Sequence, residues 1–139
     1  MILDEILTFN DVPQWVAERL TIVVHEFGEE QYDFYIQSLK LDEHDRLSNE
    51  CVALFLTSKE FIKVKFSLRH VYIEKHKLSA ITDVIKQIEV PTDDVFKDED
   101  AEYISADLIF NNKPILCLGE PELKTSSNMK NFKKLIKHL

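Results

Sequence analysis

Apolar side chains near the N-terminus recur every three or four positions, the spacing of a helix that buries one face. A short amphipathic segment comes first, carrying Ile2, Leu3, Ile6 and Leu7. A second helix is expected to begin at a cap on Asn10 or Asp11, to tolerate Pro13 in its first turn, and to stop at Gly28. Its apolar stripe consists of Val12, Trp15, Val16, Leu20, Val23, Val24 and Phe27.

From Tyr32 onward the apolar period changes to two, which predicts strands. A half-buried strand is expected from Tyr32 to about Leu41, and a second from Cys51 to Thr57. In the third, Ile62, Val64, Phe66 and Leu68 share one face. The apolar positions then change parity at Val71 and Ile73, so the pattern predicts a turn or bulge near Ser67–Arg69.

Residues 78–90 fit two structures. Their apolar spacing matches a helix behind a Ser79 cap, whereas their β-branched residues favour a bent strand from Thr82 to Val90, which we prefer. A hairpin follows, in which Asn111-Asn112 turns between Ile104–Phe110 and Ile115–Leu118. Ser126, Ser127 or Asn128 then caps a last helix. Its buried stripe is expected to be Met129, Phe132, Leu135, Ile136 and Leu139, with Lys130, Lys133, Lys134 and Lys137 on the wet face.

These elements predict an α+β fold in a single domain over residues 1–139. Residues 1–28 are a helical N-terminal extension, and residues 29–139 are a β-rich body closed by the C-terminal amphipathic helix. The body is expected to be an antiparallel β sandwich or a bent barrel. The alternative is an α+β sandwich with one sheet and helices packed on one face.

Seven strands followed by a closing helix resemble the pleckstrin-homology-like fold, in element order and length over residues 31–139. The resemblance implies a helix that plugs one end of a bent barrel, with Phe132 where family members commonly carry a tryptophan. Lipid-binding members present basic residues around the first strand connection. Here that connection is acidic, from Asp42 to Arg46, which argues against phosphoinositide binding.

Charge and composition narrow the function classes. The formal net charge is −8, and residues 1–60 hold 13 acidic against four basic side chains. Such a chain repels nucleic acid and anionic lipid at long range, so we expect no nucleic-acid and no membrane partner. Only two glycines are present, Gly28 and Gly119, too few for a phosphate-cradling loop. No basic leader or apolar run of about 20 residues is found, so a cytoplasmic location is expected.

Candidate chemistry is sparse. Glu74 and His76, with His70 on the same strand face, could share a metal ion, but a solvated strand face explains them better, and we predict no metal site and no cofactor. Cys51 and Cys117 lie in apolar runs and are read as core residues rather than nucleophiles. The acids at 93–94 and 98–100 lack the spacing of a calcium loop. We therefore predict no catalytic residues and no enzymatic activity.

What remains is a non-catalytic protein-interaction domain that engages a partner, most simply a basic protein, through an acidic surface or a sheet edge. The predicted contact residues are Asp42, Glu43, Asp45, Glu50, Glu29 and Glu30. The alternative is a small acidic inhibitor or immunity or counter-defence protein that neutralises a toxin or nuclease. The sequence leaves the oligomeric state open.

Overall fold

The N-terminal apolar stripe forms a helix that packs on a sheet. The computed structural model describes residues 12–26, 32–90, 102–111 and 113–139. Helix α2 (Gln14–His25) buries Val16, Leu20 and Val23, as predicted. It begins later than expected, because Pro13 has an extended ψ of 154° and occupies the N-cap position. The shorter helix predicted at Ile2–Leu7 lies outside the described residues.

Seven strands follow, in two antiparallel sheets. Sheet A is the meander β1 (Asp33–Lys40), β2 (Glu50–Leu56), β3 (Glu60–Phe66) and β4 (Val71–Lys77). Sheet B is the meander β5 (Ile81–Glu89), β6 (Glu102–Phe110) and β7 (Lys113–Gly119). The strand interpretation of residues 78–90 is confirmed, since a 3-10 turn at Leu78–Ala80 leads directly into β5.

The predicted parity change is a turn between β3 and β4, where the Ser67 N–H donates to the His70 carbonyl. Phe66 then lies opposite Val71 and Val64 opposite Ile73, so the apolar face continues across the hairpin. No strand pairing joins sheet A to sheet B among the described residues, and no barrel closes. The fold class is α+β, as predicted.

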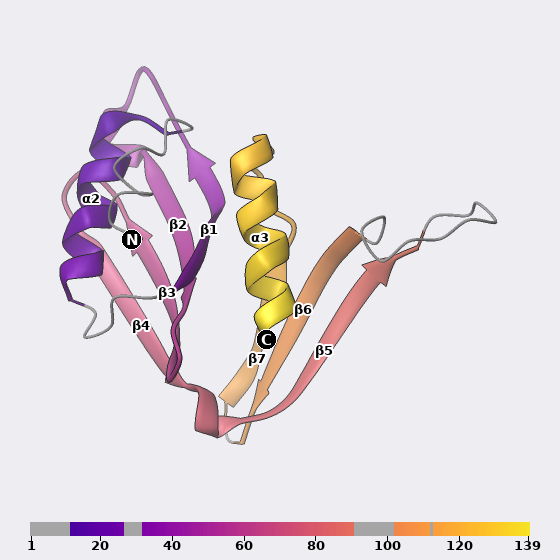
Figure 1. The fold of residues 1–139 in the computed structure, drawn as a ribbon. Coiled ribbons are helices and arrows are strands. Elements are labelled where there is room, and N and C mark those ends of the chain that lie inside the picture. The colour runs from indigo at the N-terminus through magenta and orange to yellow at the C-terminus, as the bar shows by residue number, and fades with distance from the viewer. Residues whose placement is uncertain (1–11, 27–31, 91–101, 112) are drawn as a thin grey trace.

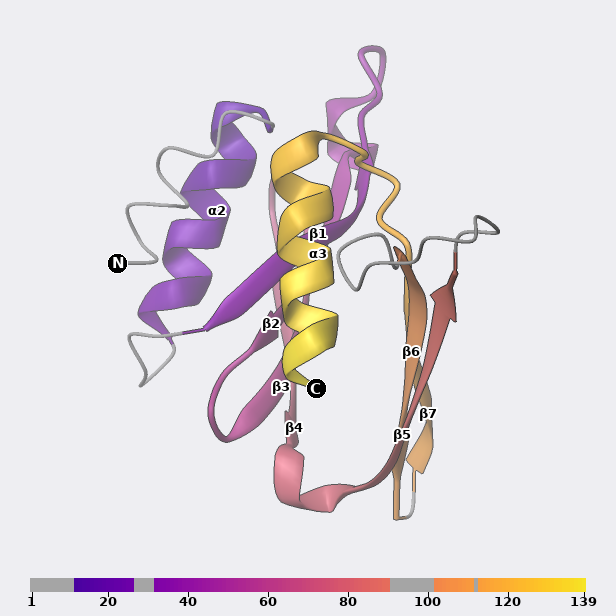
Figure 2. The same cartoon turned by 45° about the vertical axis from the view of Figure 1, so that its right-hand side comes forward.

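Helix α3 (Ser126–His138) lies between the two sheets, while α2 covers the opposite face of sheet A (Figures 1 and 2). Two cores result. The first joins α2 to one face of sheet A through residues such as Leu20, Phe55 and Val64. The second joins the other face to α3 and sheet B through Tyr35, Leu108 and Phe132. The order of layers is α2, sheet A, α3, sheet B.

This layering corrects the prediction of a half-buried first strand. In a half-buried strand that buries Phe34 and Ile36, Tyr35 would point to solvent, but it is fully buried and its ring lies 4.9 Å from that of Phe132, edge to face. Its hydroxyl donates to the Gly119 carbonyl of β7 at 3.2 Å, and burial raises the Tyr35 pKa. From Phe34 to Ile36 the strand is buried on both faces, because α3 covers the second one.

Helix α3 is capped by Thr125, not by the three predicted residues. The Thr125 hydroxyl accepts from the Asn128 N–H at 3.3 Å. Asn128 is instead fully buried and turned toward β1. The apolar stripe is confirmed at Phe132, Leu135 and Ile136, all at most 1% exposed.

Candidate acidic surface at the end of sheet A

The loop between β1 and β2 carries three of the predicted contact acids, and two of them hold the loop together. The Asp42 carboxylate accepts from the backbone N–H groups of His44 and Asp45, at 2.9 and 3.2 Å. The Asp45 carboxylate accepts from the Leu47 N–H at 3.2 Å and so caps the short 3-10 turn Arg46–Ser48. The loop is therefore organised by its own carboxylates.

The base of the loop is closed by Asn49, which is 7% exposed. Its side-chain oxygen accepts from the Asp42 N–H at 2.6 Å. Because these bonds form within the loop, the carboxylates of Asp42 and Asp45 are held in place by the loop itself. Asp42 and Asp45 therefore stabilise the loop as well as giving it charge.

Two leucines stand exposed among these acids. Leu41 is 51% and Leu47 is 56% exposed, although both are large apolar residues. The two leucines add exposed apolar area to a loop that is otherwise polar and charged. We call this set the acidic loop surface; it consists of Leu41, Asp42, Glu43, Asp45 and Leu47. Sequence reasoning missed the leucines, although Leu47 in a wholly polar stretch was the available signal.

Glu50 and His70 lie at the same end of sheet A, where both line one pocket. Glu50 forms an ion pair with Lys65, with 3.5 Å between Oε2 and Nζ, and both side chains are well exposed. A shallow pocket of about 350 Å³ opens beside them. It is lined by Glu50, Lys65, Phe66, Ser67, His70 and Tyr72. The remaining predicted contact acids, Glu29 and Glu30, lie outside the described residues.

The metal candidates are only partly brought together. His76 Nε2 lies 3.0 Å from Glu74 Oε2, but neither ring nitrogen of His76 has a hydrogen bond of good geometry. The ring is turned into the protein, 4.8 Å from that of Phe110, whereas His70 precedes the strand and is exposed. Over the described part of the chain, no three His, Cys, Asp or Glu side chains gather as a metal site. The acids at 93–94 and 98–100 fall outside that part.

The cysteines differ from each other. Cys51 is buried as predicted, and burial together with the Glu50 charge raises its pKa to about 12, so its thiol stays protonated at neutral pH. Cys117 is exposed, which corrects the reading of it as a core residue. It lies on the outer face of β7, opposite Asp107, and a hydrogen bond to that carboxylate raises the Cys117 pKa.

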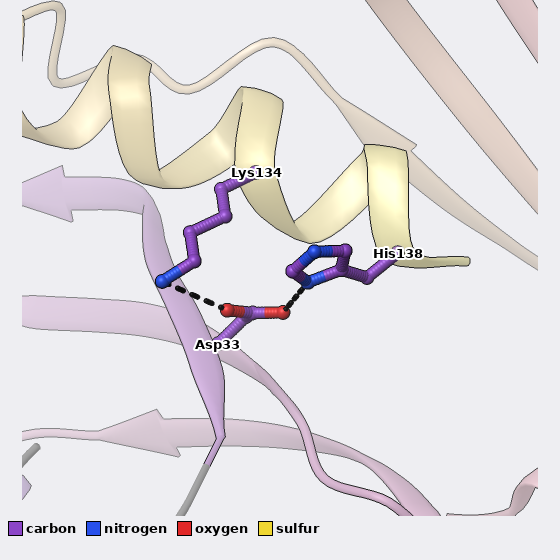
Figure 3. A network of polar contacts seen from close by, with 3 residues as sticks. All are labelled: Asp33, Lys134 and His138. Atoms are coloured by element: carbon purple, nitrogen blue, oxygen red, sulfur yellow. Dashed lines mark hydrogen bonds and ion pairs between the residues drawn. The ribbon is translucent and has the colours of Figure 1, made fainter.

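Lys134, on the lysine-rich face of α3, contacts sheet A at Asp33. The Asp33 carboxylate, 13% exposed, lies 3.6 Å from Lys134 Nζ and 2.5 Å from His138 Nδ1 (Figure 3). These contacts tie the last turns of α3 to the start of β1. Lys130 and Lys137 are exposed on the same helix.

No helix in the described residues is long and apolar enough to cross a membrane. No protein-family model matches the chain, and comparison with curated proteins and with solved structures gives no match.

Proposed function

We propose that this chain is a non-catalytic protein-interaction domain that binds a basic partner protein through the acidic loop surface. The observation that carries the proposal is the combination of exposed leucines with carboxylates held in place by hydrogen bonds within the loop. Leucines supply apolar contact, and carboxylates steer a basic partner toward it. A preformed loop loses little conformational entropy on binding.

The test removes charge without breaking the loop. Asn retains the side-chain oxygen that accepts from backbone N–H groups, so Asp42→Asn and Asp45→Asn, combined with Glu43→Gln, neutralise three charges and keep the turn. The matched control neutralises three exposed acids elsewhere, by Glu18→Gln, Glu26→Gln and Glu102→Gln. Both variants change the net charge equally.

Partners are selected with the wild-type chain from a displayed library of basic domains and Lys- and Arg-rich peptides. We expect their association rate to fall steeply as ionic strength rises, and the loop variant to associate at least about tenfold more slowly than the control variant. Leu47→Ala should act mainly on dissociation, since an apolar contact is lost only after docking. Partners that bind both triple variants equally well would contradict the proposal.

A narrower proposal is that the partner is a toxin or nuclease and that binding inhibits it. It is favoured by the concentration of 13 acids in the first 60 residues, which suits rapid capture of a basic active site. A selected partner that retains full activity when saturated with the chain would leave only the broader proposal. Under both proposals, the chain acts in the cytoplasm.

At the level of fold, we propose a relation to pleckstrin-homology-like domains, supported by four strands, three strands and a C-terminal helix in that order. The acidic first connection indicates a member without headgroup binding. Vesicles containing phosphoinositides should therefore not retain the chain at an ionic strength of about 0.15 M. Retention that is abolished by Lys65→Ala would contradict this assignment.

A further inference from the structure

We propose that the free edge of β5 pairs with β5 of a second copy, giving a dimer with one continuous six-stranded sheet. The proposal is independent of the acidic loop surface, which belongs to sheet A. In sheet B, β5 pairs with β6 along one side only, and no described strand covers its other side. An unpaired edge presents N–H and C=O groups that another strand can bond.

Each of the other three edges is partly occupied or disfavoured for pairing. On β1, the Asn128 side chain bonds both the N–H and the C=O of Ile36 at 2.8 Å, and the Glu122 N–H donates to the Gln37 carbonyl. On β7, Pro114 has no N–H to donate, and the Gly119 carbonyl already accepts from Tyr35. On β4, residues 74–77 are Glu-Lys-His-Lys, and charged edge strands resist pairing.

The β5 edge carries exposed apolar side chains on both faces. Val84 is 38% and Ile88 is 44% exposed on the inner face, although Val84 lies opposite the buried Leu108. Ile85 is 56% exposed on the outer face, opposite Asp107. Neither face of β5 is covered well enough to bury them, because α3 packs on β1 and β6. Strand addition would bury all three further.

The strand is self-complementary in one register. In a two-fold antiparallel pair, residues directly opposite each other share a face, so one residue lies opposite its own copy. Ile85 is the midpoint of Ile81–Glu89, and pairing centred there overlaps the strand along its full length. It places Asp83 opposite Gln87 and Val84 opposite the aliphatic stem of Lys86. No like charges are opposed.

The neighbouring register is disfavoured by charge. Pairing centred on Lys86 would set Lys86 against its own copy and Asp83 against Glu89, and like charges directly opposite destabilise a sheet. In the Ile85 register, the bulge at Thr82 lies near the strand end, opposite Ile88, so Asp83–Gln87 pair without interruption. The occupant inferred is therefore a second copy of this chain, paired through Ile85.

Sedimentation at an ionic strength of about 0.15 M tests the dimer, since each copy carries a charge of −8 that must be screened. One strand pair is a small interface, so dimerisation is expected in the micromolar range or weaker. Ile85→Lys should raise the dimer dissociation constant by at least about tenfold. The matched control is Ile115→Lys, which changes an equally exposed residue on the opposite edge strand, 61% exposed, and should leave that constant unchanged.

Cross-linking tests the register without adding charge. With exposed Cys117 replaced by Ser, Ile85→Cys should give a covalent dimer on mild oxidation, because directly opposed side chains are within disulfide reach. Lys86→Cys in the same background should not, since its two copies lie diagonally apart. A chain that stays monomeric up to roughly 1 mM would overturn the proposal, as would a dimer that survives Ile85→Lys without forming the Ile85→Cys cross-link. The acidic-loop proposal would stand in either case.

Discussion

At the scale of single residues, Asn128 is the buried polar group that joins α3 to the backbone of β1. It has no exposed surface, and its amide makes three hydrogen bonds, two to Ile36 and one to the Leu123 carbonyl, each 2.8 Å long. Its amide bonds the N–H and C=O of Ile36 at the edge of β1, as a neighbouring strand would. A buried amide is tolerable here because its donors and acceptor are all used.

Asn128→Ala should lower the free energy of unfolding by about 2–4 kcal/mol, because it leaves two buried backbone groups of Ile36 and the partly buried Leu123 carbonyl without this partner. Asn131→Ala, three residues along the same helix, should change it by no more than about 0.5 kcal/mol. Urea denaturation measures both. Equal effects would mean that water replaces the Asn128 bonds and that this amide contributes no net stability.

Phe132 is the aromatic residue that fills the space between the sheets, at 1% exposure and against Tyr35. Phe132→Ala should destabilise the chain by about 3–5 kcal/mol through the cavity that it leaves. The exposed Lys137→Ala on the same helix serves as control, with an expected change below about 0.5 kcal/mol. Similar midpoints for the two variants in chemical denaturation would contradict the observed packing of α3.

At the scale of elements, the burial of a strand does not follow its content of β-branched residues. Six of the seven residues of β2 are buried, since α2 and α3 cover its two faces and β1 and β3 cover its edges. Strand β5 has no buried residue, although five of its nine residues are β-branched, against one of seven in β2. The difference arises from position in the sheet, not from propensity.

Hydrogen exchange should follow this order. Amides of β2 are expected to exchange only through global unfolding, whereas those of β5 open locally at much lower free energy. In the proposed dimer, raising the protein concentration should slow exchange in β5 alone. Protection in β5 equal to that in β2 for a dilute monomer would show that an unpaired edge does not weaken this strand.

At the scale of the whole molecule, sheet A separates the two cores and contributes side chains to both. Leu20 of α2 belongs to the core on one side of sheet A. Leu108 of β6 belongs to the core on the other side, around α3. A change that loosens the packing on one face of sheet A is therefore expected to weaken the packing on its other face. The layers are therefore expected to unfold together despite having no continuous core.

Leu20→Ala and Leu108→Ala should each destabilise by about 2–5 kcal/mol and each retain a single cooperative transition. Thermal unfolding followed by far-ultraviolet circular dichroism and by fluorescence of Trp15, which packs on the α2 side, tests this. If fluorescence changed at a lower temperature than circular dichroism in the Leu20 variant, α2 would be an independently melting layer.

The sequence by itself determined the elements. The three-to-four spacing predicted α2 and the buried stripe of α3, and the alternation at Ile62, Val64 and Phe66 predicted β3, because local periodicity reports which side of an element meets apolar surroundings. Charge determined the acidic character of the loop from Asp42 to Arg46. These properties depend only on neighbours along the chain.

The tertiary structure decided what each face meets. Tyr35 and Asn128 are polar by type and buried, whereas Leu47, Ile85 and Cys117 lie in the open. The reason is that burial depends on elements distant in sequence. The placement of α3 between the sheets buries Tyr35 of β1, and no described element covers the outer face of sheet B, which leaves Ile85 and Cys117 exposed. The sequence shows that Asp42 and Asp45 are charged. Only the folded loop shows that their carboxylates accept hydrogen bonds from its backbone N–H groups.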